Sequence, residues 1–162
     1  MNGDWFWWGG RSGENAFQKL YGQYYDRLVR FHHLNNHIWV FGGNEIRPKV
    51  GPYVDYFPCH DVVDMLATDV NTDNYAGNDY EDLLALANGK PIALAKVGPL
   101  PTPELLKQPP RWAWCTVWGD TVGGRNDRTV SNALLGSDQV ATWEELPWVK
   151  VKNPTVHFPG PK

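Results

Sequence analysis

One lysine stands near the end of an apolar stretch that carries no other charge. Residues 91–98 read Pro-Ile-Ala-Leu-Ala-Lys-Val-Gly, with Gly89 before them and Pro99 after. A short apolar run bounded by Gly and Pro is typical of a strand that is buried on both faces of a parallel sheet. Ligands bind where such strands end, so Lys96 is predicted to stand at a ligand-binding edge.

Polar residues also follow three other apolar stretches, at 41–45, 69–71 and 118–120. In a parallel sheet these ends point the same way, and in a barrel they form one mouth. The aromatic loop at 5–8 is expected to join them. A mouth with tryptophan rings and few polar groups suits sugars, whose C–H faces stack on rings while their hydroxyls form hydrogen bonds. Glu45 and Asp69 could be catalytic carboxylates there, or could cap turns and pair with a neighbour such as Arg47.

The elements that would position these residues alternate between strand and helix. The patterns predict strands at 37–41, 64–70, 91–98 and 112–118, and helices at 14–34, 79–87, 104–108 and 127–135. Such alternation favours an α/β fold of parallel βα units. Four strands make half of a (β/α)8 TIM barrel, which needs about 250 residues. We expect one domain over 1–149 and an extended, proline-containing tail over 150–162.

Composition narrows the class of ligand. The chain has 162 residues, a formal net charge of -3, nine Trp, seven Tyr and six Phe. We therefore expect neither nucleic acid nor a membrane as a partner, and there is no apolar run of about 18 residues. His33 and His37 lie on either side of a predicted helix exit, so we do not expect them to form a metal site. No other cofactor is expected. The first residues lack a basic and then apolar leader, so we expect either a cytoplasmic protein or one whose true beginning lies further upstream.

The residues resemble a known family. The chain is similar to the family 26 glycoside hydrolases, the β-mannanases, from Met1 to about Trp148. The segments that carry the likeness occur in order along the chain: 5–9 (WFWWG), 25–28 (YDRL), 34–40 (LNNHIWV), 44–47 (NEIR), 62–64 (VVD), 67–69 (ATD), 89–94 (GKPIAL) and 112–114 (WAW). The resemblance implies strands five to eight, with their helices, of a (β/α)8 barrel from a retaining endo-β-1,4-mannan hydrolase.

The resemblance also assigns roles to residues. Retaining glycosidases use two carboxyl groups, one as acid/base and one as nucleophile. The implied acid/base lies upstream of Met1. The implied nucleophile, a glutamate in a Gly-Glu-Val-Gly-like motif, falls on position 96, where this chain has lysine. Trp5 and Trp118 match ring positions beside the cleaved bond, and Asn71 stands where the family commonly has a tyrosine, for which Tyr75 could substitute.

Several hypotheses follow from this assignment. An ammonium cannot form the glycosyl ester, so we expect the chain to be inactive alone. It could be one half of a split or truncated enzyme that needs a complementary N-terminal half, or a non-catalytic protein that binds β-mannan through Trp5 and Trp118. A half-barrel could also self-associate through its open edges. A different interpretation makes Lys96 a Schiff-base nucleophile. Trp39, Trp112 and Trp114 are expected to pack in the core.

Overall fold

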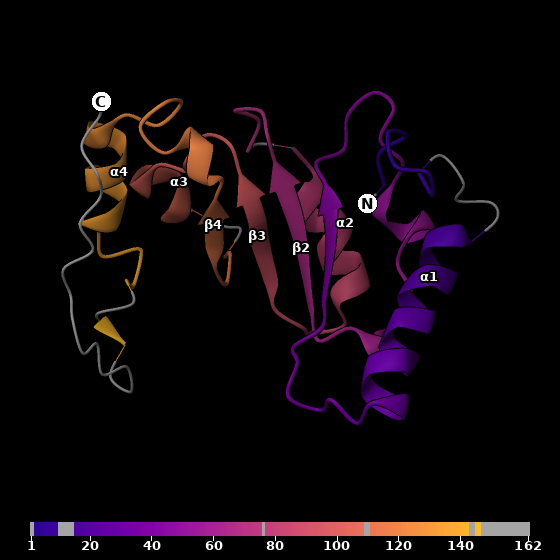
Figure 1. The fold of residues 1–162 in the computed structure, drawn as a ribbon. Helices are drawn as coiled ribbons and strands as arrows, with labels where there is room; N and C mark the ends of the chain where they lie inside the picture. Colours follow the sequence, from indigo (N-terminus) through magenta and orange to yellow (C-terminus); the bar gives the residue numbers. More distant parts are fainter. Residues whose placement is uncertain (1, 10–14, 76, 109–110, 143–144, 147–162) are drawn as a thin grey trace.

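Four parallel strands form the centre of the structure and follow one another across the sheet in chain order (Figure 1). The computed structural model describes residues 2–9, 15–75, 77–108, 111–142 and 145–146. The strands are β1 (Val40–Asn44), β2 (Met65–Val70), β3 (Ile92–Val97) and β4 (Cys115–Val117). Because sequential strands are parallel neighbours, their carboxyl ends meet at one edge of the sheet, as the sequence predicted.

Helices and short helical turns flank and connect the strands. They are α1 (Ala16–Tyr25), which continues as the π-helical segment η2 (Asp26–Phe31), then α2 (Asp79–Ala87), α3 (Pro103–Leu106) and α4 (Arg128–Leu135), together with short 3-10 turns at η3 (Tyr53–Asp55), η4 (His60–Val62) and η5 (Gly119–Thr121). Thr102 and Asp127 cap α3 and α4 by accepting hydrogen bonds from backbone N–H groups of the first turn. The helix α2 coincides with its predicted range.

The sequence sets both ends of α2. Its first turn carries three acidic residues, a charge that the positive end of the helix dipole stabilises. Asn88, with a φ of 48°, and Gly89, with a φ of 81°, end the helix in the left-handed region. That conformation closes helices and then returns the chain to the next strand.

One face of the sheet holds the core. Phe41, Leu66 and Ile92 project from three neighbouring strands and pack against Phe17 of α1 and Leu83 of α2; each is at most 5% exposed. Burying side chains of this size stabilises the fold by about 1.5–3 kcal/mol each. Helices α1 and α2 therefore cover the same face, and α2 is visible behind the strands in Figure 1.

Strand β1 both begins and ends three residues later than predicted, and the two glycines that the sequence suggested as its end lie within it. Gly42 and Gly43 are both strand residues. A Cβ atom on Gly43 would lie 2.4 Å from the ring of Tyr53, so the missing side chain gives that ring its place against the strand. Trp39 stays before the strand, where it contacts the rings of Tyr21 and Tyr25. The strand predicted at 112–118 is shorter in the structure, where it spans Cys115–Val117.

A buried polar group lies between the sheet and α2. The Tyr53 hydroxyl donates a hydrogen bond of 2.6 Å to the Asp79 carboxylate and shares another of 2.6 Å with the Thr68 hydroxyl. The backbone N–H of Ile46 donates to the same carboxylate at 2.7 Å. Burial raises the pKa of Asp79 above its usual value, although the hydrogen bonds from Tyr53 and Ile46 oppose the shift. These contacts join β2, η3 and the start of α2 to the segment that follows β1.

This raised pKa predicts a pH dependence of stability. Folded Asp79 keeps its proton over a range, starting near pH 4, in which the unfolded chain has lost it. The free energy of unfolding must therefore fall through that range as pH rises. We expect the unaltered protein to lose stability relative to Asp79→Asn as pH rises above about 4. Urea unfolding at several pH values measures this; Glu81→Gln, an exposed site in the same helical turn, is the control. Parallel stability curves for wild type and Asp79→Asn would contradict it.

The predicted tail at 150–162 lies outside the described residues. In the part of the chain that the structure describes, no helix is long and apolar enough to cross a membrane.

Candidate functional site

An open cleft lies on the face of the sheet opposite the core. Its aromatic and apolar lining comes from the loop at 3–9 and from the strands, and it consists of Trp5, Phe6, Val40, Trp114 and Trp118, with Gly42 and Ala95 as small residues. Its polar lining comes from the strand ends and consists of Asn44, Arg47, Asp69, Asn71 and Lys96. Residues from all four predicted strand ends thus meet in one place, beside the aromatic loop.

A β-bulge places Lys96 in this cleft. Thr68 pairs with Leu94, but the next residue of β2, Asp69, pairs with Lys96, so β3 holds one extra residue at Ala95. The pairing of β3 with β4 contains the same irregularity. Leu94 and Val97 consequently pack in a buried cluster. Simple alternation would put Lys96 on the same face as Leu94; the bulge turns it to the opposite one.

Lys96 contacts one acidic and one aromatic residue. Its Nζ lies 2.8 Å from the Asp69 carboxylate and 4.7 Å from the centroid of the Trp118 ring. The side chain of Lys96 is 44% exposed, whereas that of Asp69 is 14% exposed. Burial raises the pKa of Asp69, and the hydrogen bond and charge of Lys96 counteract the shift. The cationic end of the pair therefore faces the cleft.

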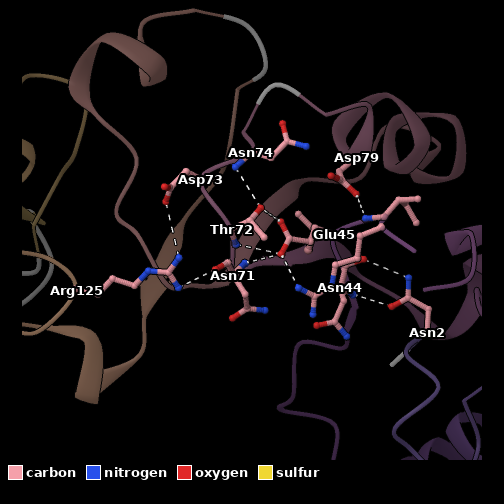
Figure 2. A network of polar contacts seen from close by, with 12 residues as sticks. Asn2, Asn44, Glu45, Asn71, Thr72, Asp73, Asn74, Asp79 and Arg125 are labelled. Atoms are coloured by element: carbon pink, nitrogen blue, oxygen red, sulfur yellow. Dashed lines mark hydrogen bonds and ion pairs between the residues drawn. The ribbon is translucent and has the colours of Figure 1, made fainter. Parts of the chain in front are cut away.

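The second carboxyl group near the strand ends, Glu45, is occupied by structural contacts (Figure 2). It accepts hydrogen bonds from the backbone N–H groups of Asn71 and Thr72, at 3.0 and 3.1 Å, and from the Thr72 hydroxyl at 2.6 Å. Arg47 lies 3.7 Å away, and Glu45 itself is 3% exposed. Glu45 thus fixes the loop after β2, in agreement with its interpretation as a turn-capping residue.

Two long-range contacts hold the other loops of the cleft. Arg125, in the loop after β4, donates a hydrogen bond of 2.8 Å to the carbonyl of Asn71, as Figure 2 shows. Asn126 is 3% exposed; its amide donates to the carbonyl of Gly98 at 2.7 Å and accepts from the N–H of Leu100 at 2.7 Å. These residues tie the loops after β2, β3 and β4 together, which fixes the surroundings of Trp118.

Asn2 anchors the loop that carries Trp5. Its side chain is 1% exposed and forms hydrogen bonds with both the N–H and the carbonyl of Asn44 at 2.8 and 3.2 Å, and with the carbonyl of Gly51 at 2.8 Å. The backbone N–H of Gly51 also donates to the carbonyl of Asn2. Trp5 is 52% exposed beside this anchor, and the Arg47 guanidinium lies 5.7 Å from its ring centroid.

Comparison with protein families shows to which family the chain belongs. The family model described as Glycosyl hydrolase family 26 matches residues 1–151. The chain belongs to glycoside hydrolase family 26. Its four-stranded parallel sheet with helices is accordingly part of a (β/α)8 barrel, as predicted. The resemblance seen in the sequence motifs is therefore confirmed at the level of the family.

Relatives in family 26 include both sequences and solved structures. A mannan endo-1,4-β-mannosidase of Thermothelomyces thermophilus is 38% identical over 151 residues, which are 89% of this chain and 30% of that protein. The structure of GH26A from a Muricauda species is 44% identical with a TM-score of 0.86, covering 90% of this chain and 49% of that one. A β-mannanase from a symbiotic protist of the termite Reticulitermes speratus, solved with a gluco-manno-oligosaccharide, is 27% identical with a TM-score of 0.69, covering 90% and 46%. The chain thus spans half or less of the length of these relatives.

Most of the residues proposed from the sequence of this family 26 chain line the cleft. Lys96, Trp5, Trp118 and Asn71 do so together. Tyr75 lies elsewhere: its ring packs against the cluster formed by Val70, Leu94 and Val97, and its hydroxyl donates a hydrogen bond to the carbonyl of Pro99. Burial raises the pKa of Tyr75. Asn71 therefore lines the cleft, whereas Tyr75 is not among its lining residues.

Two residues line the cleft that the sequence did not predict there. Trp114 was expected to pack in the core, as Trp112 does, but it lines the cleft, and Arg47 was considered only as a partner for Glu45. Trp114 precedes Trp118 by four residues, which in an extended segment places both on the same side. This spacing is the sequence signal that could have placed Trp114 in the cleft. Among the described residues, no group of three or more His, Cys, Asp or Glu side chains could hold a metal ion.

Proposed function

We propose that this chain forms half of a cleft that binds β-1,4-mannan or a related β-glycan, and that it binds this polysaccharide without cleaving it. The observation that carries the proposal is the position of Lys96, which lies in a tryptophan-lined cleft at the point to which the family resemblance assigns the nucleophilic glutamate. The relatives named as mannan endo-1,4-β-mannosidases support the choice of polysaccharide.

The charges in the cleft argue against the family's double displacement. That reaction requires two carboxyl groups about 5–5.5 Å apart. Asp69 is the only carboxylate among the described lining residues, and it is paired with Lys96 at 2.8 Å. The ammonium of Lys96 also places positive charge where an oxocarbenium-like transition state would develop more of it. With its Nζ 2.8 Å from Asp69, Lys96 acts in this proposal as a cation and not as a Schiff-base nucleophile.

The rings and amides of the cleft can still hold a sugar chain. Trp5 and Trp118 are 52% and 45% exposed, and they present flat apolar faces next to the amide side chains of Asn44 and Asn71. Rings provide stacking area for sugar C–H groups, and amides provide donors and acceptors for hydroxyls. Completion of the barrel by an N-terminal half, or by a second copy of the chain, stays a prediction.

Binding of mannohexaose should depend on Trp118. We expect Trp118→Ala to weaken the affinity about tenfold, because truncating an aromatic anchor at a binding site typically costs more than 1 kcal/mol. Isothermal titration calorimetry measures this. Trp7→Ala is the matched control, since Trp7 lies on the aromatic loop, is 65% exposed and does not line the cleft. The absence of heat with the unaltered chain, or an equal loss in Trp7→Ala, would rule out the proposed binding.

A further inference from the structure

The cleft presents more positive than negative charge to a ligand. Two cationic side chains line it, Lys96 and Arg47, and they are 44% and 39% exposed. Their acidic partners are turned inward: the side chain of Asp69 is 14% exposed and that of Glu45 is 4% exposed. The formal net charge of the whole chain is -3, so this local excess of exposed cations does not follow from composition.

Both cations retain hydrogen-bond donors. An ammonium has three donors, and Asp69 is the acidic partner of Lys96 at 2.8 Å. Arg47 approaches Glu45 only to 3.7 Å, which is longer than a hydrogen bond, and a guanidinium has five donors. Either side chain can therefore donate to an anionic group on a ligand without leaving its present position.

Each cation also lies beside a tryptophan of the cleft. Lys96 Nζ is 4.7 Å from the centroid of the Trp118 ring, and the Arg47 guanidinium is 5.7 Å from that of Trp5. A sugar that stacks on either ring would place its edge, with the substituent at C5, near a cation. In a neutral mannose unit that substituent is a hydroxymethyl group, whereas in a uronate it is a carboxylate, which forms shorter and stronger hydrogen bonds with cationic donors.

We propose that this cleft prefers an acidic β-glycan, in which carboxylates replace some of the hydroxymethyl groups, to the neutral polysaccharide. The inference rests on the proposed function, because it requires that the cleft binds a β-linked sugar chain. Lys96 then has a positive role in recognition, since the substitution that removes the nucleophile also supplies a donor for a carboxylate. Arg47 beside Trp5 supplies a second donor of the same kind.

Titration calorimetry with two matched oligosaccharides tests this inference. One is mannohexaose and the other is the β-1,4-linked hexamer of mannuronate, which has the same linkage and ring configuration but carries C5 carboxylates. At low salt we expect the mannuronate hexamer to bind roughly tenfold tighter, as two charge-assisted hydrogen bonds allow. In the unaltered chain, 0.5 M NaCl should weaken the binding of mannuronate and leave that of mannohexaose nearly constant.

Variants assign the preference to the cleft. Lys96→Gln should lower the affinity for mannuronate by roughly fivefold more than that for mannohexaose, because a cation is lost and Asp69 is left uncompensated. Lys19→Gln makes the same charge change on α1, outside the cleft lining, and should preserve the preference.

Equal, salt-independent binding of both hexamers would overturn the inference and leave the proposed function standing. Binding of neither hexamer would overturn both. The salt series needs no variant, so it decides the question even if Lys96→Gln fails to fold.

Discussion

Glutamate at position 96 is expected to turn the binding cleft into a hydrolytic one. The experiment joins the N-terminal part of a catalytically active family 26 relative to this chain, with Lys96 or with Lys96→Glu. We expect release of reducing sugar from mannan to be at least about 10³-fold faster with Lys96→Glu, because removing a catalytic nucleophile typically costs several orders of magnitude. The Lys96 version should bind mannan and release little sugar.

The bulge at Ala95 is the physical reason to expect this gain. It already directs the side chain of residue 96 into the cleft beside Trp118, so the new carboxylate needs no change in the backbone. Lys96→Gln is the matched control, because it removes the positive charge but cannot form a glycosyl ester. Equal hydrolysis by the Lys96 and Lys96→Glu versions would mean that the nucleophile lies at another position.

Removal of the Glu45 carboxyl group should destabilise the fold more than any change at the cleft surface. Glu45→Ala leaves the N–H groups of Asn71 and Thr72 and the Thr72 hydroxyl without their acceptor at a site that is 3% exposed. We expect a loss of about 3 kcal/mol, since unsatisfied buried polar groups cost about 1–3 kcal/mol each and the loop can recover part of this by meeting water. For a domain of this size that corresponds to a fall in Tm of roughly 6–12 °C.

Urea unfolding of three variants separates the contributions. Thr72→Val removes only the hydroxyl contact and should cost about 1 kcal/mol, while Glu45→Gln keeps one oxygen as an acceptor and should lie between the other two. Mannohexaose binding should also weaken in Glu45→Ala, because Asn71 belongs both to this loop and to the cleft lining. A loss below 1 kcal/mol for Glu45→Ala would show that the loop holds its position without this carboxyl group.

The order of elements could be predicted because each has a local signal. The apolar run before Lys96, the acidic first turn of α2 and the Gly and Pro residues between segments each specify an element without tertiary information. The convergence of Lys96, Asn71 and Trp118 followed from the parallel order of the strands. Parallel strand ends must meet at one edge, so the sequence alone predicts that their polar residues lie close together.

Features that depend on tertiary contact could not be predicted in this way. The position of Gly43 within β1 is explained only by the ring of Tyr53, which lies ten residues further along the chain. The roles of Arg125 and Asn126 arise from loops brought together by the sheet. The family resemblance offered Tyr75 as a substitute for a tyrosine of the cleft, but its ring packs against Val70 and Leu94. Packing against distant segments decided each of these cases.

The bulge in β3 also bears on how such a cleft can evolve. The backbone, and not the side chain, determines that residue 96 points into the cleft, so the side chain at this position can be exchanged while the sheet stays the same. Codons for lysine and glutamate can differ by a single base. One point mutation could therefore exchange a nucleophile for a binding cation, or restore it, in a scaffold that keeps its geometry in both states.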